Sequence, residues 1–225
     1  MKANKFSAAT GLIVSASIFM MSCIQKNYYN VAPNNTNNNN PGNNAYYSYT
    51  FDEEFNGADI YGWSFTDPAD SAYASISNGS YEYVDYSAVK SNMSVVSSGA
   101  NTSGNFTVQA RLQSNNIMGL IIGASSVDNG YAFYIDTAGH YSLYKEGNAA
   151  AASTIMIAST ADSLAINKGW NTLEVDQLNG NWTGYINGSW VFTMAAPALS
   201  GASFGFKVLP ATVGYADYLI VQSTQ

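Results

Sequence analysis

The chain of 225 residues has one cysteine, one histidine and one arginine, and each scarcity excludes a class of protein. A single cysteine, Cys23, cannot build a disulfide framework. With His140 as the only histidine, a zinc site would lack its usual ligand set, and a Ser-His-Asp mechanism would depend on one residue in or after a turn. The chain has 8 basic and 15 acidic residues, and the resulting formal net charge of −7 argues against nucleic acid as a partner.

The chain also lacks an apolar run long enough for a transmembrane helix, which needs about 20 residues. The longest such segment is Gly11–Met21, and it follows Lys2 and Lys5. A positive start, a short apolar stretch and the small residue Ser22 are the parts of a cleaved secretory signal. We therefore expect residues 1–22 to be a signal peptide.

The end of this signal, Met20-Met21-Ser22-Cys23, resembles the lipobox of bacterial lipoproteins. The resemblance implies that Cys23 carries the acyl chains that anchor the protein in a lipid bilayer. Ile24 follows the cysteine, which in lipoproteins of this kind implies the outer membrane. An ordinary cleaved signal with a spare thiol is the alternative.

Residues 23–48 have few side chains that could bury apolar area. They include the run Asn37–Asn40 together with Pro33, Pro41 and Gly42. Such a segment cannot offset the entropy lost on ordering, so we expect a disordered tether between the lipidated cysteine and a folded domain.

From Tyr49 onward the apolar residues alternate with polar ones, and no sustained helical period occurs. Turn dipeptides recur at Asn78-Gly79, Asn129-Gly130, Ala138-Gly139, Asn179-Gly180 and Asn187-Gly188. Many short strands joined by such turns predict an all-β, antiparallel two-sheet jelly-roll sandwich over residues 49–225. Met118–Gly123 is apolar at every position, which predicts a central strand covered on both faces.

Two hairpins predict which side chains face the core. About Asn179-Gly180, the apolar set Leu173, Val175 and Ile186 shares one face, so Glu174, Asp176, Thr183 and Tyr185 face outward. About Ala138-Gly139, the inward residues are Phe133, Ile135, Tyr141 and Leu143, so the outward ones are Ala132, Tyr134, Ser142 and Tyr144.

These strands resemble the concanavalin A-like lectin and glucanase sandwich, in particular its laminin-G-like and 3-keto-disaccharide-hydrolase-like branch. The stretches that carry the resemblance are Tyr49–Phe55 with Gly62-Trp63, Gly130–Asp136 with Gly139–Leu143, Trp170–Val175, Tyr185–Gly188 with Val191, and Asp217–Val221. They are mostly core positions and turns. The resemblance therefore implies the fold and leaves the activity open.

The sharpest chemical pattern is Glu174-Val175-Asp176, which resembles the catalytic strand of family 16 glycoside hydrolases. The resemblance would make Glu174 the nucleophile and Asp176 its assistant. Retaining chemistry needs a second carboxyl group as general acid, and the third position of the pattern is Leu178. The alternative is a polar pair that faces solvent or contacts a sugar.

Aromatic and polar residues that face outward suggest a sugar-binding surface. If their strands share one sheet, Tyr134, Tyr144 and Tyr185 would form a stacking platform beside Glu174, Asp176 and Arg111. Half-buried strands also favour tyrosine for packing alone. Trp63 and Trp182 are expected to pack in the core or at an edge.

Calcium is the cofactor for which the sequence offers a candidate site. Asp52, Glu53 and Glu54 on the first strand and Asp217 on the last would supply oxygen ligands if the terminal strands pair. The alternative is a set of edge charges that discourages aggregation.

The sequence thus predicts an envelope lipoprotein, facing the periplasm or the cell surface, whose sandwich binds a polysaccharide or oligosaccharide without catalysis. The first alternative is a glycoside hydrolase or lyase that acts on polysaccharide. The second is a structural or adhesive surface module.

Overall fold

The computed structural model describes residues 47–69, 71–88, 93–126, 129–147 and 152–224. The chain divides into two units, Met1–Gly42 and Asn43–Gln225, and the described residues all belong to the second. The predicted signal peptide, Cys23 and the tether up to residue 46 lie outside them. No helix in these ranges has the length and hydropathy to cross a membrane.

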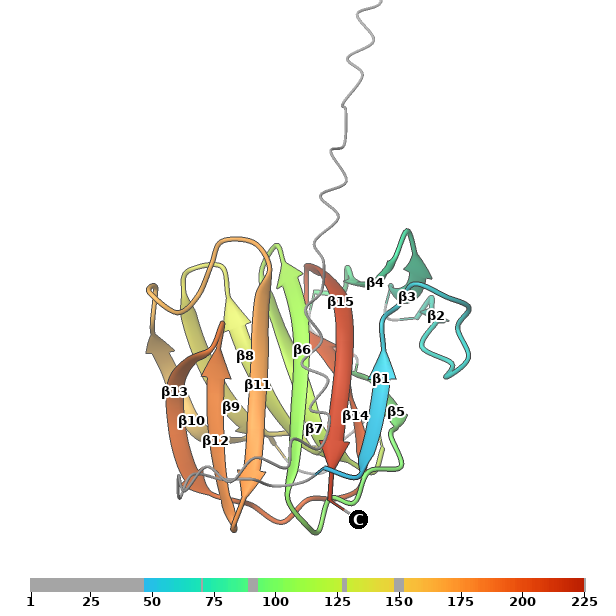
Figure 1. The fold of residues 1–225 in the computed structure, drawn as a ribbon. Helices are drawn as coiled ribbons and strands as arrows, with labels where there is room; N and C mark the ends of the chain where they lie inside the picture. The colour runs from blue at the N-terminus through green and yellow to red at the C-terminus, as the bar shows by residue number, and fades with distance from the viewer. Residues whose placement is uncertain (1–46, 70, 89–92, 127–128, 148–151, 225) are drawn as a thin grey trace, which may run out of the picture. The chain divides into compact units, whose positions relative to one another are not determined.

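In the residues that the structure describes, fifteen strands form two antiparallel sheets, which Figure 1 shows as two layers. The nine-stranded sheet has the order β13 (Ser189–Ala195), β12 (Asn181–Ile186), β11 (Asn171–Leu178), β6 (Phe106–Ser114), β15 (Thr212–Ser223), β4 (Ser80–Asp85), β3 (Ala72–Ser77) and β2 (Phe65–Asp67), and β1 (Tyr49–Glu53) also pairs with β15. The six-stranded sheet has the order β10 (Thr154–Ala161), β9 (His140–Lys145), β8 (Tyr131–Asp136), β7 (Ile117–Ala124), β14 (Ser203–Val208) and β5 (Met93–Ser97). The predicted fold class is confirmed.

Both predicted hairpin registers are confirmed. Glu174 lies opposite Tyr185, and Asp176 lies opposite Thr183. Phe133 pairs with Leu143 on the other sheet. Asn179-Gly180 holds its register because both residues have positive φ, 50° and 75°, as a two-residue turn between twisted strands requires.

The core lies between the sheets and contains the inward rows of both. Leu173, Val175 and Ile186 of the nine-stranded sheet are fully buried, and so are Phe133 and Leu143 of the six-stranded sheet. Trp63 and Trp182 are also fully buried in the core. The short strand β2 was not predicted, because its three residues are too few for an alternation to show.

Strand β7 is central and buried on both faces, as its sequence predicted. Its inner face joins the main core. A second apolar cluster covers the outer face, formed by Met93, Ile121, Ala124, Ala132 and Tyr134. The six-stranded sheet therefore also buries apolar side chains on the face that points away from the sandwich core.

Candidate functional site

The structure divides the predicted site residues between the two sheets. Tyr134 and Tyr144 lie on β8 and β9 of the six-stranded sheet. Tyr185, Glu174, Asp176 and Arg111 lie on β12, β11 and β6 of the nine-stranded sheet. The single platform of three tyrosines is therefore wrong, because its strands do not share a sheet. Two separate surfaces replace it.

On the nine-stranded sheet, a row of outward side chains crosses four neighbouring strands. Trp190 of β13 pairs with Tyr185 of β12, Tyr185 with Glu174 of β11, and Glu174 with Gln109 of β6. Neighbouring strands lie about 4.8 Å apart, so the row is about 14 Å long. We call this row, with Asp176 and Thr107 beside it, the carboxylate face.

Trp190 is the aromatic residue of this face that the sequence analysis missed, and Gln109 and Thr107 were also not singled out. Its side chain is 63% exposed, whereas Trp63 and Trp182 are fully buried. The indole Nε1 donates a hydrogen bond of 3.0 Å to Thr193 Oγ1, which in turn lies 3.4 Å from Thr183 Oγ1. These contacts hold the ring in one orientation at the sheet edge, beside Tyr185. Alternation with buried Val191 was the signal that could have placed Trp190 outward.

Hydrogen bonds hold both carboxylates of the face. Gln109 Nε2 donates to Glu174 Oε2 at 2.6 Å, and Tyr218 donates to Gln109 Oε1 at 2.9 Å. Thr107 Oγ1 donates to Asp176 Oδ1 at 2.6 Å, and the Tyr47 hydroxyl lies 2.8 Å from Thr107 Oγ1. Since the Thr107 proton points at Asp176, Tyr47 is the donor of the last bond.

Burial raises the pKa of both carboxyl groups above their ordinary values. For Glu174, the hydrogen bond from Gln109 opposes this shift, and the neighbouring Asp176 adds to it. For Asp176, the hydrogen bonds with Thr107 and Glu174 oppose it. Burial, followed by the charges of Asp176 and Glu174, also raises the pKa of Tyr185, so its hydroxyl stays protonated at neutral pH. The face thus offers protonated phenols and carboxyl groups poised to accept hydrogen bonds.

Arg111 lies on the same sheet, two residues along β6 from Gln109, and it forms an ion pair with Asp217. Its Nη1 lies 2.9 Å from Asp217 Oδ2, and its guanidinium stacks 5.1 Å from the ring centroid of Trp170. Asp217 is therefore occupied by a cation of the chain itself. Both groups remain partly exposed.

The acidic residues proposed for calcium do not gather. The terminal strands β1 and β15 do pair, but Asp52 lies opposite Ile220 and not Asp217. Glu53 turns inward, where it accepts from Phe55 N at 2.9 Å and from Trp63 Nε1 at 3.2 Å. Within the described ranges, no three His, Cys, Asp or Glu side chains form a group that could hold a metal ion.

The second surface is a pocket of about 360 Å³ on the six-stranded sheet. Tyr134, Tyr144, Ile117 and Leu209 supply apolar walls, and Ser142 and Ser159 supply hydroxyl groups. The rings of Tyr134 and Tyr144 meet edge to face, with centroids 6.0 Å apart. Both predicted tyrosines of this sheet therefore line one cavity.

The pocket also contains a buried ion pair. Glu146 Oε2 lies 2.5 Å from Lys207 Nζ, and the two side chains are 3% and 13% exposed. Tyr134 donates to Glu146 Oε1 at 2.9 Å, and Ser153 donates to Oε2 at 3.2 Å. Sequence analysis missed this group because Lys207 and Glu146 are 61 residues apart and carry no local motif.

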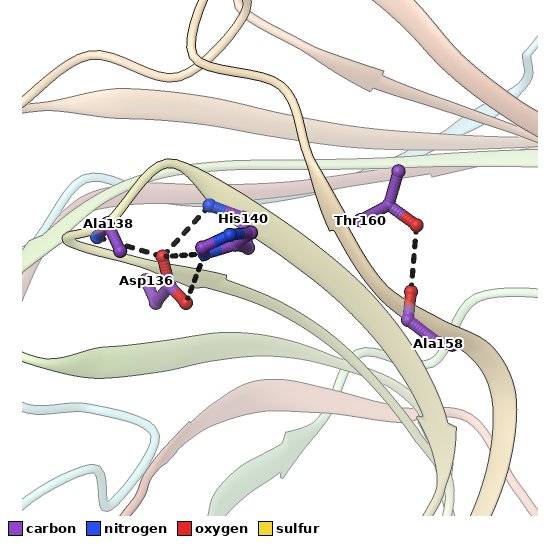
Figure 2. Close-up of polar contacts among 5 residues, drawn as sticks. All are labelled: Asp136, Ala138, His140, Ala158 and Thr160. Atoms are coloured by element: carbon purple, nitrogen blue, oxygen red, sulfur yellow. Dashed lines mark hydrogen bonds and ion pairs between the residues drawn. The ribbon is translucent and has the colours of Figure 1, made fainter.

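His140 lines the same pocket and begins β9 directly after the β8–β9 turn, as the sequence predicted (Figure 2). Its ring Nδ1 lies 3.1 Å from Asp136 Oδ2. The carboxylate of Asp136 also accepts the backbone N–H groups of Ala138 and His140, both at 2.9 Å. The pair therefore closes the β8–β9 turn, beside β10, where Thr160 donates to the Ala158 carbonyl.

This chain is similar to several solved structures of low sequence identity. A solved carbohydrate-binding module, CBM66 from Bacillus subtilis, is 16% identical over 75% of this chain and 93% of its own, with a TM-score of 0.43. The β-glucanase of Bacillus licheniformis is 10% identical over 78% and 98%, with a TM-score of 0.46. An endo-β-galactosidase from Clostridium perfringens, which releases GlcNAcα1-4Gal, is 14% identical over 81% and 64%, with a TM-score of 0.49.

No family model matches the chain, and no curated protein matches it. At these identities the likeness to solved structures concerns the fold alone. Function has to be argued from the side chains of this chain.

Proposed function

We propose that the sandwich binds an oligosaccharide chain, without cleaving it, along the carboxylate face. The observation that carries this proposal is the exposed, hydrogen-bonded ring of Trp190 beside Tyr185 and Glu174. A sugar ring packs its C–H face on an aromatic ring while its hydroxyl groups bond to amides and carboxylates. The row supplies both kinds of group in sequence, over a length that exceeds one sugar ring.

The binding face is preorganised, which favours recognition. Gln109 is fixed between Tyr218 and Glu174, and Thr107 is fixed between Tyr47 and Asp176. Side chains held in one rotamer lose little entropy when a ligand arrives. The charged groups of the face are the carboxylates of Glu174 and Asp176, which repel anions and accept hydrogen bonds, so the face suits a neutral, hydroxyl-rich chain.

The surroundings of the Glu174–Asp176 pair favour sugar binding over hydrolysis. Retaining hydrolysis needs a proton donor opposite the nucleophile. The third position of the strand pattern is Leu178, which has no proton to give. Glu174 and Asp176 are also bound to Gln109 and Thr107, which suits fixed hydrogen-bond acceptors.

A glycan array probed with the full chain and matched variants tests the proposal. Trp190→Ala should weaken binding by about 2 kcal/mol, roughly thirty-fold, as for a central aromatic contact. Leu164→Ala is the control, because Leu164 is 98% exposed and lies outside the face. If no glycan binds, or if Trp190→Ala binds like the unchanged chain, the proposal fails and the structural or adhesive alternative gains.

Hydrolysis is tested in the same preparation. Any glycan that binds is incubated with the unchanged chain and with Glu174→Gln, and products are separated by chromatography. We expect no cleavage by either. Cleavage that disappears in Glu174→Gln would establish the glycoside hydrolase alternative.

We also propose that acyl chains on Cys23 anchor this domain to the outer membrane. The support is the signal-like segment and the Met20–Cys23 order. Metabolic labelling with palmitate should mark the unchanged chain and not Cys23→Ser. In membrane fractionation, the unchanged chain should be recovered with the membranes and Cys23→Ser in the soluble fraction. Equal labelling of both would overturn the anchor.

A further inference from the structure

The pocket on the six-stranded sheet is built in a way that folding alone does not require. Three elements meet at Glu146: Tyr134 comes from β8, Lys207 from β14, and Glu146 itself follows β9. Removing two charges from water is costly, and an apolar pair of similar size often stabilises a fold as well or better. A buried ion pair in the wall of a cavity is therefore a candidate for recognition.

The position of Tyr134 in the pocket wall depends on a glycine. Gly119 of β7 pairs with Tyr134, and a Cβ atom added to Gly119 would lie 2.6 Å from the Tyr134 ring. The missing side chain lets the ring lie flat against the sheet, 5% exposed, with its hydroxyl on Glu146. Burial raises the pKa of Tyr134 well above its ordinary value, so this hydroxyl remains a donor.

Polar groups of the pocket remain available to a ligand. The Lys207 ammonium has one hydrogen bond to a described residue, the bond to Glu146, although an ammonium carries three N–H groups. The hydroxyl groups of Ser142 and Ser159 bond to no other side chain or backbone group in the ranges that the structure describes. Tyr144 adds a half-buried aromatic wall beside them.

The charges define the class of ligand. The acidic and basic side chains that line the pocket are two carboxylates, Glu146 and Asp136, together with one lysine and one histidine. The pocket therefore has no excess positive charge to bind a phosphate, sulfate or carboxylate. Aromatic walls with several hydroxyl and N–H groups suit a flat polar ring. A cavity of about 360 Å³ limits that ring to a small molecule or a chain end.

We propose that this pocket binds one neutral sugar residue, such as the end of a glycan chain, independently of the carboxylate face. The two surfaces lie on different sheets, so one domain would hold two glycan sites. Two sites on one molecule raise avidity for a dense glycan layer and allow two chains to be linked.

The test titrates the full chain with free monosaccharides and observes ligand saturation-transfer NMR. The probes are glucose, galactose, mannose and N-acetylglucosamine, with glucuronic and galacturonic acid as the charged counterparts. We expect at least one neutral sugar to bind at millimolar concentration, and more tightly than either acid. No binding by any neutral sugar, or tighter binding of an acid, would overturn the proposal.

Variants assign the signal to the pocket. Ser159→Trp places an indole in the cavity from exposed strand β10 and should weaken binding about ten-fold or more. Thr154→Trp, on the same exposed strand but outside the pocket lining, should bind like the unchanged chain. Both changes are made in the Trp190→Ala background, so that the carboxylate face does not contribute to the signal. Loss of the signal in Trp190→Ala alone would assign the monosaccharide to the carboxylate face, and binding that survives Ser159→Trp in that background would exclude the pocket.

Discussion

On both sheets, successive side chains of a strand point alternately to the core and to the outer face. The two outer faces differ in the kind of side chain that they carry. Outward residues of β11 and β6, such as Glu174, Asp176, Gln109 and Thr107, are polar and half-buried. Outward residues of β7 and β8 include Ile121, Ala132 and Tyr134, which are buried in a second apolar cluster. The first face is an open row, and the second encloses a pocket.

This difference shows how one fold provides two kinds of binding surface. An open polar row contacts the length of a chain, whereas a walled pocket contacts a single ring. The ion pairs of the two faces differ in the same way. Arg111 and Asp217 are partly exposed, and Glu146 and Lys207 are nearly fully buried.

The largest expected effect comes from breaking the buried ion pair. Lys207→Met leaves Glu146 without its cation inside the protein and should lower the free energy of unfolding by about 3–5 kcal/mol. Arg111→Met removes a partly exposed pair and the contact with Trp170, so its cost should be about 1–2 kcal/mol. Urea unfolding measures both. Equal costs would show that the pocket pair is as hydrated as the surface pair.

A smaller effect is expected from a substitution that crowds Tyr134 in the pocket wall. Gly119→Ala places a methyl group against the Tyr134 ring and should cost about 1–3 kcal/mol. Gly57→Ala is the control, because nothing lies within 4 Å of an added Cβ and the change should be neutral or slightly stabilising. Thermal unfolding compares them, and a neutral Gly119→Ala would mean that the ring moves without cost.

Local sequence signals were sufficient for the hairpins. Asn179-Gly180 allows only one register for β11 and β12, so the positions of Glu174 and Tyr185 follow from counting residues. The two-sided apolar composition of Met118–Gly123 likewise predicted the central place of β7. Trp190 was also within reach, since its neighbour Val191 faces inward.

Local sequence signals could not predict that the candidate site residues are divided between the two sheets. Nothing in the sequence around Tyr134 or Tyr185 states which sheet each hairpin joins, because that depends on β11 pairing with β6 and β7 pairing with β14. The Glu146–Lys207 pair depends on the same long-range pairing. Sheet membership was the missing information, and it decided which tyrosines act together.

The carboxylate face should respond to pH with a definite sign. Raised pKa values mean that the folded protein binds protons more tightly than the unfolded chain, so stability falls as pH rises from the ordinary values, 4.5 for Glu174 and 3.8 for Asp176, through the raised ones. Glu174→Gln removes one of these groups. It should stabilise the protein at pH 7 relative to the unchanged chain, and this gain should disappear at about pH 3.

Urea unfolding at both pH values measures this difference. Glu82→Gln is the control on the same sheet, where Glu82 Oε1 accepts from Tyr215. The change in the free energy of unfolding that this variant shows is the baseline against which Glu174→Gln is compared. A Glu174→Gln variant that is less stable at pH 7 would mean that the Gln109 hydrogen bond outweighs the cost of burial.

The smallest effect should come from the orientation of Trp190. Thr193→Val removes the acceptor of the indole N–H but keeps the ring and the shape of the side chain. Because both residues are exposed, the free energy of unfolding should change by less than about 0.5 kcal/mol. Binding of the glycan identified on the array should weaken by about 1 kcal/mol, roughly five-fold, since the ring is then free to turn. Unchanged affinity would mean that the ring contributes area alone and that its fixed orientation has no part in recognition.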